Sequence, residues 1–246
     1  MIFDNFENAS FNPECNYPEV SGFDENSELS NSEVETLIRD LIPAKNIENC
    51  PSITCEPENL LWNVYPDALG LYDTQTSEIL LAGAENINET GTTELEVLLH
   101  EIGHNAYDSL LVSDPQRAAD WAELYDESLV VFEATGFGFV SQYSHTDMFE
   151  DFAESYAEYV ANPQLMQFLC PDKYNFMKEY VFEGREYDYA FQPENNSYVL
   201  TLKYNADTLN RAFLASGGSE LDDIQASLRL EPIQDNFRCF SMIGSS

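Results

Sequence analysis

The chain of 246 residues is 43% hydrophobic and 13% aromatic, and its 45 acidic and 10 basic residues give a formal net charge of −35. This length and apolar content allow one large domain, or one domain with a small addition, and they exclude a wholly disordered chain. So acidic a surface repels phosphate backbones and anionic lipid, and no apolar run in the sequence reaches the length of a membrane-spanning helix. We therefore expect a soluble protein that binds no nucleic acid and does not insert into membranes.

The N-terminal part of the chain divides into a polar segment and a predicted helix. Residues 1–30 are rich in Asn, Glu, Ser and Pro, which predicts an irregular N-terminal arm. Residues 32–42 are expected to form a helix that ends at Pro43, because apolar side chains recur there at helical spacing. That apolar stripe consists of Val34, Leu37, Ile38 and Leu41.

The next segment favours strands. Residues 60–65 are apolar and aromatic and stop at Pro66, which predicts a strand. Residues 69–72 and 78–82 flank a polar stretch that begins at Asp73, which is typical of a β-hairpin. We expect a small sheet whose last strand comes shortly before the helix that follows.

A helix is predicted from about residue 94 onward. Thr93 and Glu96 form the T-x-x-E pattern of a helix start, and the segment after them is apolar on one side. Its apolar positions are Leu95, Leu99, Ile102 and Ala106. Within this helix lies an H-E-x-x-H motif formed by His100, Glu101 and His104.

The motif predicts a zinc site. Residues four apart on a helix project from the same face, so His100 and His104 can bind one metal ion. Glu101 lies next to the first ligand and is placed to reach a water molecule. This is the arrangement of hydrolytic zinc sites, in which zinc acidifies the water and a carboxylate accepts the proton. The same letters also occur by chance on solvated helix faces, but two of only three histidines lie in this motif and its neighbours are apolar, which favours zinc.

Two more helices are predicted after the motif. Residues 118–131 are expected to be helical, with apolar side chains on an acidic background. A later helix, capped by Thr146 or Asp147, is expected to run to about Ala161. Its core-facing side chains are predicted to be Phe149, Phe152, Ala153, Tyr156 and Val160.

Three stretches of the chain resemble one known family when they are taken together. They are His100-Glu-Ile-Gly-His104, Tyr143-x6-Glu150-Asp-Phe-Ala-Glu154-x-Tyr-Ala, and residues 170–182. On these motifs, residues 92–182 resemble the lethal factor-like zinc metallopeptidases, the group of anthrax lethal factor and the bacterial Pro-Pro endopeptidases. The resemblance implies an α+β, zincin-like catalytic domain over residues 31–184, with metal ligands on two helices and a small sheet at the edge of the cleft. In zinc peptidases the strand before the motif helix commonly borders the cleft and pairs with extended substrate.

The resemblance also implies roles for three residues. Glu150 would be the third zinc ligand, Tyr143 would lean toward the metal as a catalytic residue, and Glu154 would steady a ligand histidine. These roles suit a zinc site with three protein ligands and one open position. Each residue has a plainer alternative. Tyr143 could be a tyrosine packed at the helix entrance, Glu154 an exposed helix glutamate, and Glu150 a carboxylate favoured by the helix dipole.

The predicted function is that of a zinc-dependent endopeptidase with one catalytic Zn²⁺ and a polypeptide substrate. Glu101 would act as general base and then as proton donor to the leaving amine. Two alternatives stay open, a secreted binding or toxin-like module with a structural zinc, and a zinc hydrolase of a non-peptide amide. The sequence indicates neither the cleavage preference nor the oligomeric state.

The cysteines and the C-terminal residues carry weaker signals. Five cysteines are scattered without a C-x-x-C pair, at positions 15, 50, 55, 170 and 239. Pairing of Cys50 with Cys55, or of Cys170 with Cys239, is open. With N-x-S/T triplets at positions 8, 88 and 195, the cysteines favour an oxidising, extracellular setting and hence a secreted protein.

Residues 185–246 match no motif and are predicted to form an extension of unknown role that packs on the catalytic domain. Within it we expect a strand at 198–204, a short helix at 207–214, and a strand or helix at 221–230.

Overall fold

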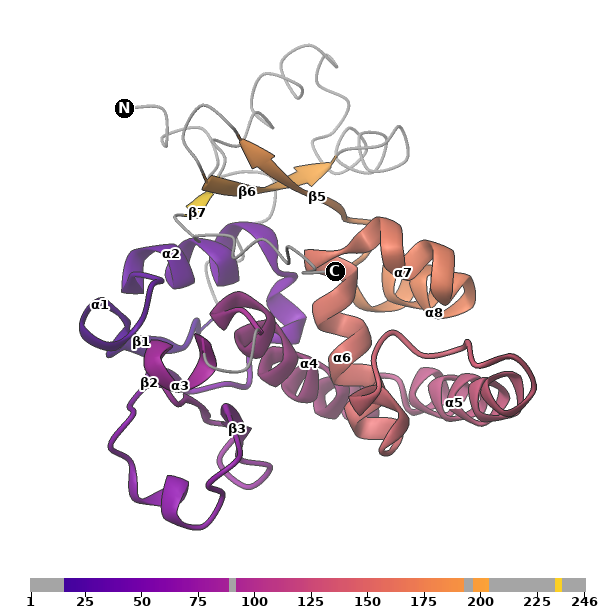
Figure 1. Ribbon diagram of the computed structural model, residues 1–246, viewed down its shortest axis with the longest axis horizontal. Coiled ribbons are helices and arrows are strands. Elements are labelled where there is room, and N and C mark those ends of the chain that lie inside the picture. The colour runs from indigo at the N-terminus through magenta and orange to yellow at the C-terminus, as the bar shows by residue number, and fades with distance from the viewer. Residues whose placement is uncertain (1–15, 89–91, 193–196, 204–232, 236–246) are drawn as a thin grey trace, which may run out of the picture.

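The computed structural model describes residues 16–88, 92–192, 197–203 and 233–235, and these form a mixed α+β protein (Figure 1). Its three long helices are α4 (Glu94–Ser113), α5 (Pro115–Thr135) and α6 (Met148–Ala161). The short helical segments are α1 (Phe23–Asn26), α2 (Asn31–Thr36), η2 (Leu37–Leu41), η3 (Ala44–Asn46), η4 (Leu60–Asn63), α3 (Ala84–Asn88), η5 (Tyr143–His145), α7 (Pro163–Leu169), α8 (Pro171–Phe176) and η6 (Met177–Val181). The strands are β1 (Glu19–Ser21), β2 (Ser52–Cys55), β3 (Gly70–Tyr72), β4 (Ile79–Leu81), β5 (Glu186–Gln192), β6 (Ser197–Lys203) and β7 (Ile233–Asp235).

The strands form two separate sheets. One has four strands in the order β1-β2-β4-β3, with β1, β2 and β4 parallel and β3 antiparallel to β4. The strand β3 is therefore at one edge of this sheet, and it packs against α4. The other sheet is antiparallel in the order β5-β6-β7 and lies at the opposite end of the molecule from the hairpin (Figure 1).

The helices α4 and α6 lie side by side in the middle of the molecule (Figure 1). They approach closely because Gly103 faces Ala153, and a Cβ on Gly103 would lie only 2.8 Å from the Cα of Ala153. The apolar side chains between these helices and their neighbours are fully buried, and they include Leu98, Leu99, Ile102, Phe152, Tyr156 and Val160. This close packing fixes the position of any side chain that projects from one helix toward the other.

Several local predictions are confirmed. The segment predicted at 32–42 is helical as α2 and η2, and its four apolar residues are buried. The predicted hairpin is present as β3 and β4. The helices predicted at 94 onward, at 118–131 and up to residue 161 are α4, α5 and α6, and the strand predicted at 198–204 is β6. The segments predicted at 207–214 and 221–230 lie outside the described residues.

The strand predicted at 60–65 is wrong, because its first four residues form the 3-10 helix η4. Local hydrogen bonds favour the turn: the Asn59 side chain accepts from the Leu61 amide at 2.9 Å, and Trp62 Nε1 donates to the carbonyl of Glu56 at 2.8 Å. An Asn side chain that bonds to the backbone two residues on stabilises a turn at the expense of an extended strand.

The expectation of an irregular arm is wrong for residues 16–30. This segment contributes β1 and α1, and Phe23 and Leu29 are buried in the core. It is held by Glu94 in the first turn of α4, whose carboxylate accepts from Ser27 Oγ at 2.8 Å and from the Glu28 amide at 2.7 Å. These hydrogen bonds to Glu94 hold the segment against α4, and the composition of the segment does not indicate such a contact. Residues 1–15 lie outside the described part.

Two further expectations need correction. Phe149 does not face the core but is 48% exposed, because it lies at the first turn of α6, where its ring packs in a T-shaped arrangement with that of Tyr107. Cys50 and Cys55 do not pair, and both thiols are buried and free, as is that of Cys170. Residues five apart along an extended segment are about 16 Å apart, which is beyond the reach of a disulfide. Cys15 and Cys239 lie outside the described residues.

The beginning of the C-terminal extension contacts the helices. Tyr159 in α6 donates its hydroxyl to the carbonyl of Arg185 at 2.6 Å, while Arg185 and Tyr187 both donate to the carbonyl of Leu41 at 2.9 and 2.8 Å. Tyr187 is buried. Among the described helices, none has the length and apolar character needed to cross a membrane.

Candidate metal site

The first half of the site is set by the start of α4. Thr93 and Glu96 form the predicted capping box, in which Thr93 Oγ1 accepts from the Glu96 amide at 3.2 Å and Glu96 Oε2 accepts from the Thr93 amide at 2.8 Å. With the start of the helix fixed in this way, His100 and His104 project from successive turns on one face.

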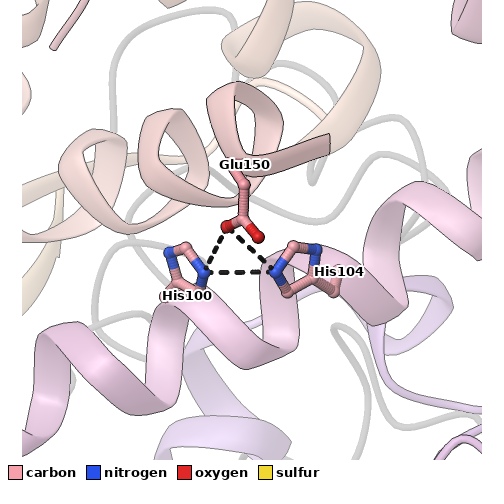
Figure 2. Close-up of side chains that lie close together, drawn as sticks. All are labelled: His100, His104 and Glu150. Atoms are coloured by element: carbon pink, nitrogen blue, oxygen red, sulfur yellow. Dashed lines mark hydrogen bonds and ion pairs between the residues drawn. The ribbon is translucent and has the colours of Figure 1, made fainter. Parts of the chain in front are cut away.

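The second half is set by the start of α6. Of the two predicted caps, Asp147 is the residue that caps the helix, and its Oδ1 accepts from the amides of Phe149 and Glu150 at 2.8 and 3.0 Å. Glu150 therefore lies in the first turn, on the face that meets α4. Figure 2 shows its carboxylate between the rings of His100 and His104, which point toward it from the other helix.

The three side chains have the spacing of a zinc site. His100 Nε2 lies 3.1 Å from His104 Nε2, and Glu150 Oε2 lies 3.1 and 3.5 Å from these two nitrogens. A tetrahedral zinc ion with bonds of about 2.0–2.1 Å has ligand atoms about 3.3 Å apart. The donor set and its spacing are therefore those that one metal ion such as zinc requires.

The carboxylate of Glu150 supports the same fit. Its Oε2 is buried and faces the two imidazole nitrogens of His100 and His104, at 3.1 and 3.5 Å. Burial alone would raise the pKa of Glu150, but the two histidines beside it outweigh burial and hold that pKa well below its usual range. A buried, ionised oxygen of this kind is suited to bind a cation.

Glu154, one turn further along α6, holds the other nitrogen of His100. Its Oε1 lies 2.9 Å from His100 Nδ1, so the predicted contact with a motif histidine is present. Burial lowers the pKa of His100, but Glu150 and Glu154 outweigh it and raise that pKa to about 10. Without metal, the ring is therefore an imidazolium held between two carboxylates, and a metal ion would displace the proton on Nε2.

Glu101 lies against the edge strand β3. Its carboxyl group is buried, and a Cβ on Gly70 would lie only 2.5 Å from Glu101 Oε1 and 2.7 Å from its Cγ. Burial raises the pKa of Glu101, although His100, His104 and a hydrogen bond with the Tyr72 backbone act in the opposite direction. A carboxylate with a raised pKa, beside a metal site, has the property that a general base at neutral pH requires.

Tyr143 lies at the open side of the site, in the loop between α5 and α6 (residues 136–147). Its ring centroid is 5.9 Å from that of His100, and its side chain is 53% exposed, so it is not packed in the core. Partial burial, the charge of Glu150 and a hydrogen bond with Glu150 raise the pKa of Tyr143 to about 12. The phenol therefore stays protonated at neutral pH and keeps a proton to donate.

Several residues around the site were not predicted from the sequence. Ser141 donates to Glu154, Gly70 makes room for Glu101, and Tyr72 stacks beside His104 with ring centroids 6.3 Å apart. We expected the second strand of the hairpin to lie next to the site. The strand in that place is instead the first one, β3. Because β4 pairs with both β2 and β3, only β3 has an edge toward α4.

Comparison of this chain with protein-family models, with curated proteins and with solved structures gives no match, so its function has to be inferred from the chemistry of its own side chains.

Proposed function

We propose that this protein is a zinc-dependent endopeptidase with a zincin-like catalytic domain. The observation that carries the proposal is the convergence of His100, His104 and Glu150 to within 4.8 Å of one another, with the buried carboxyl group of Glu101 beside them. Two histidines and one glutamate are the ligand set of known zinc peptidases, and the resemblance noted in the sequence implies the same set.

The number of ligands favours catalysis over a structural role. Within the part of the chain that the structure describes, the metal-binding group contains three residues, whereas a structural zinc site is normally closed by four. Three ligands leave one position open for water or substrate. The site is also only partly buried, so a substrate has access to it.

The division of chemical roles follows from the environments of the side chains. Bound zinc would supply Lewis acidity, which lowers the pKa of a water molecule and polarises a carbonyl. Glu101 accepts the proton of the attacking water and then donates it to the leaving amine. Tyr143 donates a hydrogen bond to the oxyanion that forms on the carbonyl, and Glu154 holds His100 in the tautomer that leaves Nε2 free.

The edge strand supports a peptide as the substrate. In the β3–β4 ladder, the Asp73 amide donates to the Glu78 carbonyl and the Ala82 amide to the Leu69 carbonyl, each at 2.9 Å. Strand residues alternate in direction, so the backbone N–H and C=O groups of Gly70 and Tyr72 point away from β4, and one Tyr72 backbone group bonds to Glu101. An extended peptide could use the other backbone groups of this edge for main-chain hydrogen bonds, which would bring its own carbonyl to the site.

The test compares metal binding with peptide cleavage. The purified protein is stripped of metal, reloaded with zinc and incubated with a library of unfolded peptides. We expect one zinc per chain, cleavage that a chelator stops, and a melting curve that still shows a folded protein after chelation. Glu150→Ala should lose zinc affinity by at least about 100-fold, whereas Glu123→Ala, which removes an exposed carboxylate of α5, should change nothing.

Two outcomes would replace the proposal. Zinc binding without cleavage, together with unfolding on chelation, would identify a structural metal. Zinc binding with a stable fold and turnover of small amide substrates, but no peptide cleavage, would identify a hydrolase of another amide. Full zinc occupancy in Glu150→Ala would show that Glu150 is not a ligand.

A further inference from the structure

We propose that Ser141 is a positioning residue that couples the ligand His100 to the loop that carries Tyr143. The inference rests on the proposed function, because it concerns how Tyr143 is held over the metal site. It is carried by a chain of hydrogen bonds that runs from α4 through α6 into the α5–α6 loop.

The first link is the carboxylate of Glu154, whose two oxygens have different partners. Oε1 contacts His100 Nδ1 at 2.9 Å, and Oε2 accepts from Ser141 Oγ at 2.5 Å. Because the acceptor is a carboxylate, both are charge-assisted hydrogen bonds, which are stronger than neutral ones. Both oxygens of Glu154 are thereby held, so the Ser141 hydroxyl is attached to the same carboxylate that contacts the ligand His100.

The second link lies within the loop. Ser141 Oγ accepts from the Ser144 amide at 3.0 Å, while Ser144 Oγ donates to the Ser141 carbonyl at 2.7 Å. Ser144 is fully buried, so solvent does not reach these hydrogen bonds from the Ser144 side of the turn. Tyr143 lies between the two serines in sequence, and the direction of its side chain therefore depends on the turn that they close.

A separate contact anchors the start of the same loop. Lys173 donates from Nζ to the Gly138 carbonyl at 3.0 Å and to Asp151 Oδ1 at 2.7 Å, and both charged side chains are buried. Asp151 directly follows the ligand Glu150. The loop is thus attached to α6 at two points, and at each point the acceptor on α6 is a carboxylate close to the metal site.

Ser141 is the attachment that can be tested cleanly. Removing Lys173 would leave Asp151 as a buried charge without its partner, and such a variant is expected to unfold. Ser141→Ala removes one hydroxyl from a half-buried position and creates no buried charge, since Glu154 keeps its contact with His100. We expect kcat to fall about 10-fold, less than on loss of the Tyr143 hydroxyl itself, with little change in KM.

The experiment is a double-mutant cycle on the zinc-loaded protein. The constants kcat and KM are measured for wild type, Ser141→Ala, Tyr143→Phe and the double variant, with Ser113→Ala as a matched control at the exposed end of α4. If Ser141 acts by positioning the phenol, its loss should change kcat less than about twofold when Tyr143→Phe is already present. Independent effects that multiply would overturn the proposal.

A second measurement does not depend on activity. In the metal-free protein, amide hydrogen exchange over residues 138–147 should become faster in Ser141→Ala, with the Ser144 amide affected most, and should stay unchanged in Ser113→Ala. Unchanged exchange in Ser141→Ala would overturn the coupling. If wild type cleaves no peptide, the proposed function fails, but faster exchange together with a zinc affinity lowered about 10-fold in Ser141→Ala would still show that Ser141 links His100 to the loop, and an unchanged zinc affinity would overturn that link.

Discussion

The site has two walls that are held in different ways. On one side, Glu101 lies against the main chain of β3, where Gly70 leaves space for it and the Tyr72 backbone bonds to it. On the other side, α6 and the α5–α6 loop are joined through side chains: Ser141 of the loop donates to Glu154, and Lys173 of α8 donates both to Asp151 and to the carbonyl of Gly138. The first wall therefore depends on the absence of a side chain at one position, and the second on the presence of particular side chains.

The two walls also treat their carboxylates differently. Burial of Glu101 raises its pKa, since the backbone and the histidines only partly offset the loss of solvent. Glu150 is also buried in part, but the adjacent histidines reverse the direction and lower its pKa. The same residue type is thus suited to accept a proton on one wall and to bind a cation on the other.

The largest effect is expected from Glu101→Gln, which removes the charge of the first wall and keeps its shape. Under the proposed function, kcat should fall by a factor of about 10² to 10⁴, because glutamine cannot accept the proton. Zinc content, measured by elemental analysis, should stay at one ion per chain. Near-normal hydrolysis by this variant would contradict the role of Glu101.

Tyr143→Phe tests the second wall. Loss of one donor to an oxyanion typically lowers the rate by about 10² to 10³, and because the side chain is half exposed, the melting temperature should hardly change. Tyr125→Phe is the matched control, since that hydroxyl donates to the carbonyl of His145 at 3.3 Å, in the same loop as Tyr143. A wild-type rate in Tyr143→Phe would remove Tyr143 from the site.

Gly70→Ala should disturb the first wall through the main chain. The new Cβ would lie closer to Glu101 Oε1 and Cγ than van der Waals contact allows, so the buried carboxylate has to move. A displacement of about 1 Å can lower kcat by about 10²-fold, and we expect zinc content to be unchanged.

When Gly70→Ala is combined with Glu101→Gln, it should have little further effect on kcat. A large fall in the melting temperature of Gly70→Ala with a normal kcat would show instead that β3 gives way and Glu101 keeps its place.

The smallest effect is expected at Glu158, one turn beyond Glu154 on α6. Burial raises its pKa to about 7, Asn162 lowers it in part, and the charges of Glu96 and Glu154 add to the increase. A carboxyl group with a raised pKa in the folded state binds more protons folded than unfolded, so it reduces stability as the pH rises from about 4.5 to about 7.

Glu158→Gln should remove that loss. After allowance for partial solvation, we expect a gain of about 1 kcal/mol at pH 7.5, or about 2–4 °C in melting temperature, and almost none at pH 4.5. A gain of equal size at both pH values would assign the effect to packing and not to ionisation.

The sequence by itself determined the features that depend on neighbours along the chain. The capping box at Thr93 and Glu96 starts α4, the spacing of His100 and His104 puts both on one face, and the start of α6 was placed at Thr146 or Asp147, of which the structure selects Asp147. Helical periodicity and capping are local, because covalent geometry and hydrogen bonds within four residues set them. The hairpin and the apolar stripe of α2 and η2 were predictable for the same reason.

Only the tertiary structure decided what depends on distant segments. The close approach of Gly103 and Ala153 brings Glu150 within 3.1 Å of His100, and no local pattern fixes that meeting. The exposure of Phe149, the edge position of β3 and the bond from Ser141 to Glu154 likewise follow from which surfaces pack together. Contacts between residues far apart in sequence form only when the whole core packs, because close packing, and not periodicity, determines which faces meet.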